Sequence, residues 1–296
     1  MRGESKELND FARNSAGGSF IQLPDGITHY ELSPPLYKGE GKGVRDVVLI
    51  HGFSVPYFIY DPTFEFLADS GFRVLRYDLF GRGFSDRPRT QYDLDFFVKQ
   101  LVDLLDAIRF KQRLSLVGLS MGGPIASAFA LRHPKRADKI ILIDPVGAKP
   151  LNLSPFFKAA KIPFAAELVL NLVGSDSLVR GVASDFFDPS LVEHFIARYK
   201  IQMEYKGFRG AILSTIRNNM LGSFINVYEN LGRTNNPVQI FWGRNDSTVP
   251  FDHSEILQAV MPNAQFRVIE NCGHIPHYEK PGEFNPILLD FLRQSS

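Results

Sequence analysis

The chain has 296 residues, of which 44% are hydrophobic and 22% are charged, as in a globular protein with one large domain or one domain carrying an insertion. Its 33 Lys and Arg balance its 32 Asp and Glu, which gives no reason to expect nucleic acid as a partner. The single cysteine, Cys272, excludes an internal disulfide. Because the sequence shows neither an apolar run of 18 residues nor a signal peptide, it predicts a cytoplasmic protein without a transmembrane segment.

The first part of the chain is predicted to hold a flexible tail and a β-hairpin. Residues 1–18 are expected to form the tail, because they are polar and end in two glycines without a periodic pattern. Residues 19–23 and 27–32 flank the turn sequence Pro24-Asp25-Gly26, which predicts two antiparallel strands joined by a tight turn.

Short apolar segments then alternate with helical patterns. The segments have the composition of strands buried on both faces, and they cover residues 46–50, 72–77, 114–117, 139–143, 238–242 and 265–269. Apolar residues at three- and four-residue spacing predict helices near residues 61–70, 94–109, 121–133, 253–261 and 281–293. This alternation predicts a mainly parallel, doubly wound α/β sheet of about eight strands with helices on both faces.

Residues 148–233 interrupt the alternation, because they contain helical patterns but no strand segment. They predict a helical cap inserted in an α/β core that is formed by residues 19–147 and 234–296. The expected cap helices cover residues 156–173, 191–205 and 211–231. The cap is rich in apolar residues: most are expected to pack it onto the core, and a few to line a substrate pocket beneath this lid. Contact of the cap with a membrane surface is a weaker alternative, since polar residues interrupt its most apolar run and no basic rim accompanies it.

The strongest motif is Gly118-Leu-Ser120-Met-Gly122, which lies directly between a predicted strand and a predicted helix. A sharp strand-to-helix turn puts its central serine in a strained backbone conformation and leaves room only for small neighbours, here Gly118 and Gly122. The following helix directs its N-terminal amides toward developing negative charge. The motif therefore predicts Ser120 as a nucleophile, and the alternative is a glycine-rich turn with an incidental serine.

With this motif, the sequence resembles the α/β-hydrolase superfamily, specifically its cap-bearing esterase and lipase branch. The resemblance covers about residues 19–295 and is weakest in the cap. Its motifs occur in the family's order, and they are Ile50-His51-Gly52-Phe53, residues 78–85, the serine motif, residues 243–246 and residues 273–277. Dehalogenases and epoxide hydrolases of the superfamily use an aspartate as the nucleophile, so the serine argues against both activities.

A serine hydroxyl needs a base that removes its proton, and the sequence predicts His274 for this role. His274 follows the last predicted strand, at the edge of the sheet where the serine turn also opens, and the resemblance places the base there too. Asp246 follows the preceding predicted strand and is expected to orient the imidazole, in the chain order Ser, Asp, His. Asp144, at the end of an earlier strand, is the alternative acid.

The resemblance implies that the backbone N–H groups of Phe53 and Met121 form an oxyanion hole. It also makes His51 and Gly52 supports of the loop that carries Phe53, while His277 is expected to be a packing or surface residue. The sequence has no metal-ligand spacing such as H-E-x-x-H and no nucleotide-binding glycine loop, so neither a metal nor a cofactor is expected.

The expected function is hydrolysis of a small carboxylic ester, lipophilic or acylglycerol-like, through an acyl-enzyme intermediate. Two alternatives use the same three side chains: carbon–carbon bond hydrolysis of dienone ring-cleavage products, and cofactor-free perhydrolysis. A third alternative from another class is a non-catalytic ligand-binding protein of the same fold, against which the presence of all three residue types counts. The sequence makes no prediction of the oligomeric state.

Overall fold

A computed structural model describes residues 4–33, 45–110, 112–152 and 176–294. Its centre is one sheet of eight strands in the order β1-β2-β4-β3-β5-β6-β7-β8. The strands are β1 (Ser19–Leu23), β2 (Gly26–Leu32), β3 (Asp46–Ile50), β4 (Arg73–Tyr77), β5 (Leu114–Leu119), β6 (Ala137–Ile143), β7 (Val238–Gly243) and β8 (Gln265–Ile269). The strand β2 pairs antiparallel with both of its neighbours, β1 and β4, whereas β3 to β8 pair in parallel with one another. The predicted mainly parallel α/β sheet is therefore confirmed.

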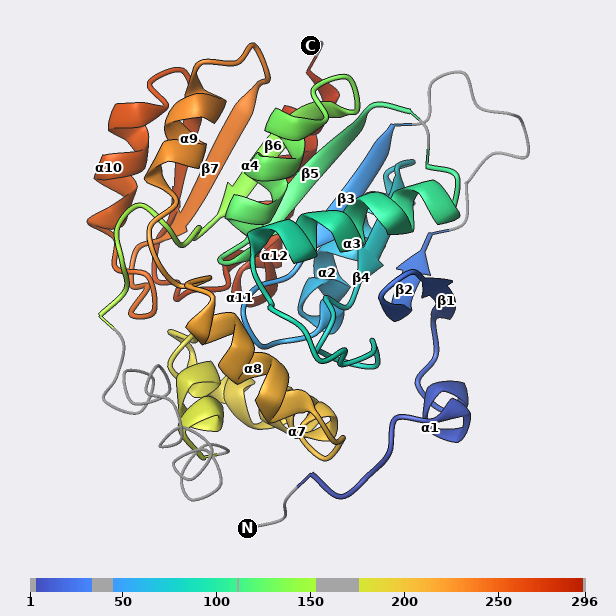
Figure 1. Cartoon of the computed structure of the whole chain (residues 1–296). Helices are drawn as coiled ribbons and strands as arrows, with labels where there is room; N and C mark the ends of the chain where they lie inside the picture. Colours follow the sequence, from blue (N-terminus) through green and yellow to red (C-terminus); the bar gives the residue numbers. More distant parts are fainter. Residues whose placement is uncertain (1–3, 34–44, 111, 153–175, 295–296) are drawn as a thin grey trace.

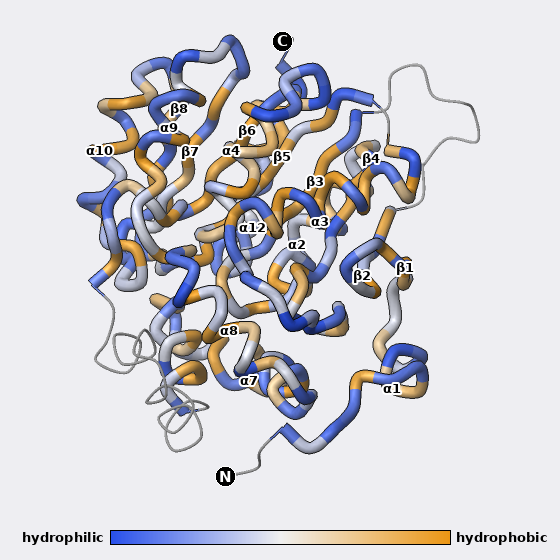
Figure 2. The backbone as a smooth tube through the Cα atoms, viewed as in Figure 1, coloured by the Kyte–Doolittle hydropathy of each residue, from blue (hydrophilic) through white to orange (hydrophobic). Residues whose placement is uncertain are grey.

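Helices cover both faces of the sheet (Figure 1). On one face lie α3 (Leu94–Ala107), α4 (Gly122–Arg132), α9 (Ile225–Gly232) and α10 (His253–Val260), and on the other lie α2 (Asp61–Asp69), α11 (Pro276–Glu279) and α12 (Pro281–Arg293). The strand β3 shows why two layers are needed, since Val48 and Ile50 belong to the core on the first face, and Val47 and Leu49 to the core on the second. Successive side chains of a strand point to opposite faces, so the four consecutive apolar residues of β3 require burial on both faces. Figure 2 shows the hydrophobic residues concentrated along these central strands.

The inserted region lies beyond the carboxyl ends of the parallel strands (Figure 1). Its described part contains a helix at residues 176–183, the short 3-10 helix η2 (Pro189–Leu191), α7 (Val192–Gln202) and α8 (Phe208–Arg217). The expected helix at residues 156–173 lies outside the described residues, and so does the run considered for membrane contact. None of the helices in the described ranges has the length and apolar character that a membrane span requires.

The C-terminal end of this insertion differs from the expectation. The sequence predicted one cap helix over residues 211–231, whereas the structure has two helices, α8 and α9, and α9 packs on α4 and α10 of the core. Tyr228 of α9 is completely buried and donates a hydrogen bond to the carbonyl of Val146 at 2.6 Å. The helical pattern indicated that this segment has an apolar face, but it did not show that the face of α9 packs on helices of the core and not within the inserted region.

The N-terminal segment also differs from the loose tail expected for residues 1–18. Residues 10–14 form the short helix α1 (Asp10–Asn14). The amides of Ser5 and Lys6 donate to the carbonyl of Glu204, and the carboxylate of Glu4 accepts the backbone N–H groups of Gly207 and Arg209 at the start of α8. These partners are about 200 positions away, so no local pattern in the sequence could predict them.

Candidate active site

Ser120 lies in the turn between β5 and α4, with a φ of 52° in the left-handed region that side chains rarely adopt. The two glycines of the motif have no space for a side chain. A Cβ atom on Gly118 would lie 2.3 Å from the carbonyl oxygen of Gly122, and one on Gly122 would lie 2.2 Å from the carbonyl oxygen of Ile50. The local sequence therefore produces the strained serine by packing backbone against backbone.

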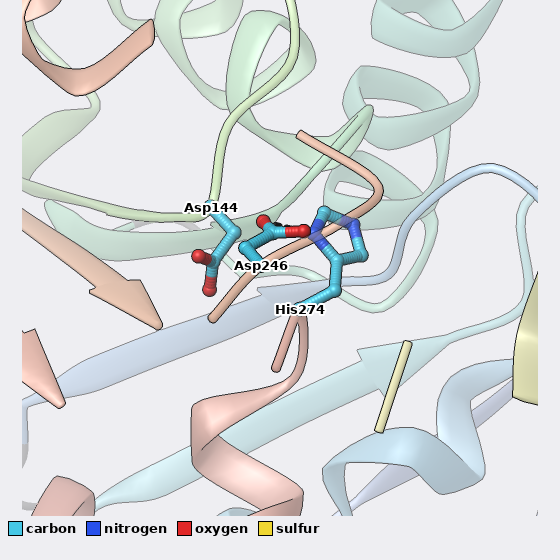
Figure 3. A group of neighbouring side chains, drawn as sticks. All are labelled: Asp144, Asp246 and His274. Carbon is cyan, nitrogen blue, oxygen red and sulfur yellow. Dashed lines mark hydrogen bonds and ion pairs between the residues drawn. The ribbon is translucent and has the colours of Figure 1, made fainter. Parts of the chain in front are cut away.

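His274 and Asp246 lie together at the carboxyl ends of β8 and β7, where Nδ1 of the imidazole is 2.7 Å from Oδ2 of the carboxylate (Figure 3). The other carboxylate oxygen, Oδ1, accepts the backbone N–H groups of Thr248 and Val249, each at 2.8 Å. Burial lowers the pKa of His274, but the charge of Asp246 and its hydrogen bond raise it more, so that the net pKa is raised. A fixed carboxylate thus holds Nδ1 and leaves Nε2 for proton transfer.

The alternative acid, Asp144, lies beside this pair, with a φ of 42° and a completely buried side chain. Polar atoms of Asp144, Asp246 and His274 all lie within 4.8 Å of one another (Figure 3). Oδ1 of Asp144 accepts the N–H of Gly243 at 2.8 Å, while Oδ2 has no hydrogen-bond partner. Burial, followed by the charge of Asp246, raises the pKa of Asp144 well above its usual range, which favours the uncharged form of this carboxyl. Of the two carboxyl groups, Asp246 is the one that bonds Nδ1 of the imidazole.

The residues expected to form the oxyanion hole lie close to the serine. Met121 is the N-cap residue of α4, where the amides of a helix start carry partial positive charge. A Cβ atom on Gly52 would lie 3.2 Å from Cβ of Ser120, so the loop that leads to Phe53 passes directly beside the nucleophile. Phe53 and Ser120 also line the same cavity.

His51 supports this loop from within the core. Its Nε2 accepts the N–H of Leu79 at 2.9 Å, and its Nδ1 donates to the carbonyl of Gly52 at 2.9 Å. Burial lowers the pKa of His51 to about 4, so the ring is neutral near pH 7 and both nitrogens keep these roles. His277, the other nearby histidine, is also buried and packs against the ring of Tyr60 with 4.7 Å between centroids.

Arg82 is a site residue that sequence reasoning missed, although it lies inside the motif at residues 78–85. Its side chain is completely buried, and burial lowers its pKa to about 10, which leaves it charged near pH 7. Its Nε donates to the carbonyl of Phe53 at 2.8 Å, and its Nη2 donates to the hydroxyl of Thr215 on α8 at 2.9 Å. One cation therefore connects the loop that carries Phe53 to α8 of the inserted region.

A second connection joins the cap to the histidine loop. The carbonyl of Asp185 accepts the N–H of His274 at 2.7 Å. The carboxylate of Glu279 accepts the backbone N–H groups of Gly273 at 3.1 Å and of Asp188 at 2.8 Å. The cap segment at residues 185–188 is thus fixed to the loop that positions the imidazole. Sequence reasoning missed both Asp185 and Glu279, because the contact of Asp185 with His274 and that of Glu279 with Asp188 join positions about 90 apart along the chain.

A cavity of about 320 Å³ lies at the junction of these elements, and both Ser120 and His274 line it. Its apolar lining comes from the core and the cap, and includes Val146, Leu178, Val182, Leu221 and Ile275. Within the described residues, the only compact group of His, Cys, Asp or Glu side chains is Asp144, Asp246 and His274. Because Nδ1 of the imidazole is already bound to Asp246, this group has the arrangement of a proton-transfer pair with a second carboxyl beside it.

Comparison with known proteins supports the same assignment of fold. The family model of the alpha/beta hydrolase fold matches residues 47–281. A 2-hydroxy-6-oxononadienedioate/2-hydroxy-6-oxononatrienedioate hydrolase of Dechloromonas aromatica is 30% identical, with 94% of this chain and 96% of the relative covered. Among solved structures, the meta-cleavage product hydrolase CumD of Pseudomonas fluorescens IP01 has a TM-score of 0.72 and 28% identity, over 93% of this chain and 97% of that chain. An esterase of Exiguobacterium antarcticum has a TM-score of 0.76 at 20% identity, over 94% of this chain and 100% of that chain, and shares the fold. From its matched motifs and its sheet, the chain belongs to the alpha/beta hydrolase fold family.

Proposed function

We propose that this protein hydrolyses small lipophilic carboxylic esters through an acyl-enzyme intermediate. One observation carries the proposal: a serine in a strained strand-to-helix turn lines the same cavity as an imidazole whose other nitrogen is held by a buried carboxylate. The apolar lining of that cavity favours a lipophilic substrate, because most of the contact area offered to the substrate is hydrocarbon.

The mechanism follows from these positions. Oγ of Ser120 attacks the carbonyl carbon of the ester and gives its proton to Nε2 of His274, while the N–H groups of Phe53 and Met121 stabilise the oxyanion. The tetrahedral intermediate breaks its bond to the alcohol, which leaves with the proton from His274. Water then attacks the acyl-enzyme with His274 as the base, and the carboxylic acid and free Ser120 are released. Asp246 keeps the proton of the resting imidazole on Nδ1 throughout.

The test uses p-nitrophenyl esters of increasing acyl length with the wild-type chain and Ser120→Ala. We expect turnover with short to medium acyl chains, and a loss of about 10⁶-fold in kcat in the variant, since the serine and its base act as a unit. A fluorophosphonate should label the wild type and not the variant. The absence of turnover with every ester would contradict the proposal.

A second candidate is hydrolysis of a carbon–carbon bond in a dienone, because relatives that are 28–30% identical over most of the chain are named as hydrolases of such compounds. The same serine and imidazole would serve this reaction. Loss of the dienone absorbance on mixing with enzyme, measured beside ester turnover and beside Ser120→Ala, separates the two candidates. If the dienone is cleaved with the higher kcat/KM, the ester assignment is wrong.

A further inference from the structure

Asp185 places a carboxylate from the cap in the wall of the cavity that contains Ser120 and His274. Its position is fixed on two sides. Oδ1 accepts the hydroxyl of Thr248 at 2.6 Å, and the backbone carbonyl accepts the N–H of His274 at 2.7 Å. The carboxylate is therefore held in the cavity wall by the two loops that carry the acid and the base, and it has no part in the mechanism proposed above.

The surroundings of this carboxylate do not neutralise it. Lys and Arg are absent from the cavity lining, as far as residues 4–33, 45–110, 112–152 and 176–294 contribute to it. The titratable groups near it are His274, Asp246 and Asp144. His274 must be neutral in order to act as a base, and neither Asp144 nor Asp246 can supply a positive charge. Burial raises the pKa of Asp185 to about 6, so above this pH the side chain is charged and adds negative potential to the cavity.

We propose that Asp185 is a specificity residue that makes the site prefer esters with a neutral acyl group over esters with an acyl carboxylate. This inference rests on the proposed ester hydrolysis and narrows its substrate class. The physical reason is repulsion between two carboxylates inside a partly enclosed, apolar cavity, where water screens the charges less than in bulk solvent. For charges several Å apart, this repulsion corresponds to a preference of about tenfold or more in kcat/KM.

The proposal predicts that this chain differs from some similar relatives in the charge of the substrate that it accepts. The hydrolase of Dechloromonas aromatica is named for dienedioate and trienedioate substrates, which carry two carboxylates. A cavity that accepts such a substrate would require a positive or strongly hydrogen-bonding wall. Apart from Ser120 and His274, the described polar wall of this cavity instead provides the carboxylate of Asp185 and the uncharged side chains of Ser54, Asn152, Ser184, Ser247 and Thr248.

The experiment compares two esters of matched length, p-nitrophenyl valerate and the p-nitrophenyl hemiester of glutaric acid. They are measured at pH 8 with the wild type, Asp185→Asn and Asp188→Asn. Asparagine keeps the size of Asp185 and an oxygen that can accept the hydroxyl of Thr248. Asp188 is the matched control, because it is an exposed carboxylate of the same cap segment that does not line the cavity.

We expect the wild type and Asp188→Asn to prefer the valerate by about tenfold or more, and Asp185→Asn to reduce that preference by a similar factor. The quantity compared is the ratio of kcat/KM for the two esters within each variant. The wild-type preference should also shrink between pH 8 and pH 5.5, since a raised pKa means that Asp185 loses its charge as the pH falls through 6. Protonation of His274 affects both esters alike and cancels in the ratio.

Two results would overturn the inference while the proposed function stands: equal kcat/KM for both esters in the wild type, or an unchanged preference in Asp185→Asn. If the wild type hydrolyses neither ester, the proposed function fails and the inference fails with it. The valerate rate of the wild type therefore distinguishes the two failures.

Discussion

The choice between Asp246 and Asp144 as the acid gives a sharp mutational prediction. In Asp246→Asn, the amide must present either its oxygen or its NH₂ group to the imidazole. Two backbone N–H groups, those of Thr248 and Val249, hold Oδ1 at 2.8 Å, and only an oxygen can satisfy them. The NH₂ group is then left to face Nδ1 of His274, which becomes an acceptor, so the ring proton moves to Nε2.

An imidazole protonated on Nε2 cannot accept the proton of Ser120. A tautomer error of this kind in a serine protease, a standard worked example, costs about 10⁴-fold in kcat, which corresponds to about 5 kcal/mol of transition-state free energy. We expect a loss of this size for Asp246→Asn. Asp144→Asn is the matched variant, because burial raises the pKa of this carboxyl and so favours its uncharged form, and the amide oxygen can still accept the N–H of Gly243. We expect the kcat of this variant to stay within a few-fold of the wild type.

The assay is kcat for p-nitrophenyl butyrate at pH 8, with the melting temperature of each variant measured in parallel to show that it is folded. The reasoning is refuted if Asp144→Asn loses as much activity as Asp246→Asn while both variants remain folded. It is also refuted if Asp246→Asn keeps more than a tenth of the wild-type kcat.

Three further predictions concern pH, packing and the buried arginine. The net pKa of His274 is raised, and the base must be neutral. We therefore expect kcat/KM for a neutral ester to fall on acidification, with a midpoint above the ordinary imidazole pKa near 6.5. A midpoint below pH 6 in the pH–rate profile would contradict this. Gly122→Ala should lower the free energy of unfolding, measured with urea, by about 2 kcal/mol or more, because its Cβ would lie 2.2 Å from the carbonyl oxygen of Ile50. Gly210→Ala is the control: nothing lies within 4 Å of its Cβ, so this substitution should leave the stability unchanged or raise it. Arg82→Met should lower kcat more than tenfold through loss of support for the oxyanion loop, and wild-type kcat in this folded variant would show that the support is unnecessary.

The sequence predicted those parts of the molecule that depend on local pattern. The strands β3 and β5 consist mostly of apolar residues, and the turn at Ser120 needs only two glycines at fixed spacing, so both could be found by inspection. What could not be found depends on contacts between distant segments. Nothing near Asp185 in the sequence indicates that its carbonyl meets His274, and the pattern of α9 does not show that its partner is α4.

The choice of acid shows the same limit in more detail. Asp144 and Asp246 both follow strands and both lie within reach of the imidazole, so position along the chain leaves them as alternatives. The difference comes from their surroundings. Both side chains are buried, but Asp246 accepts two backbone N–H groups on one oxygen and contacts the imidazole with the other, whereas Asp144 accepts one backbone N–H and its second oxygen has no hydrogen-bond partner. Charge state is a property of the folded environment, and residue type alone does not encode it.

The buried arginine has a consequence for how the enzyme would rest between turnovers. Arg82 donates to the carbonyl of Phe53 with one nitrogen and to the hydroxyl of Thr215 on α8 with another. If α8 moves away from the core, Arg82 loses its hydrogen bond to Thr215, and the loop that carries Phe53 loses part of its support. An open form of the enzyme would therefore be less active. Packing of α8 on the core and ordering of the proposed oxyanion hole would then occur together. Hydrolysis would be restricted to substrates that the closed form encloses.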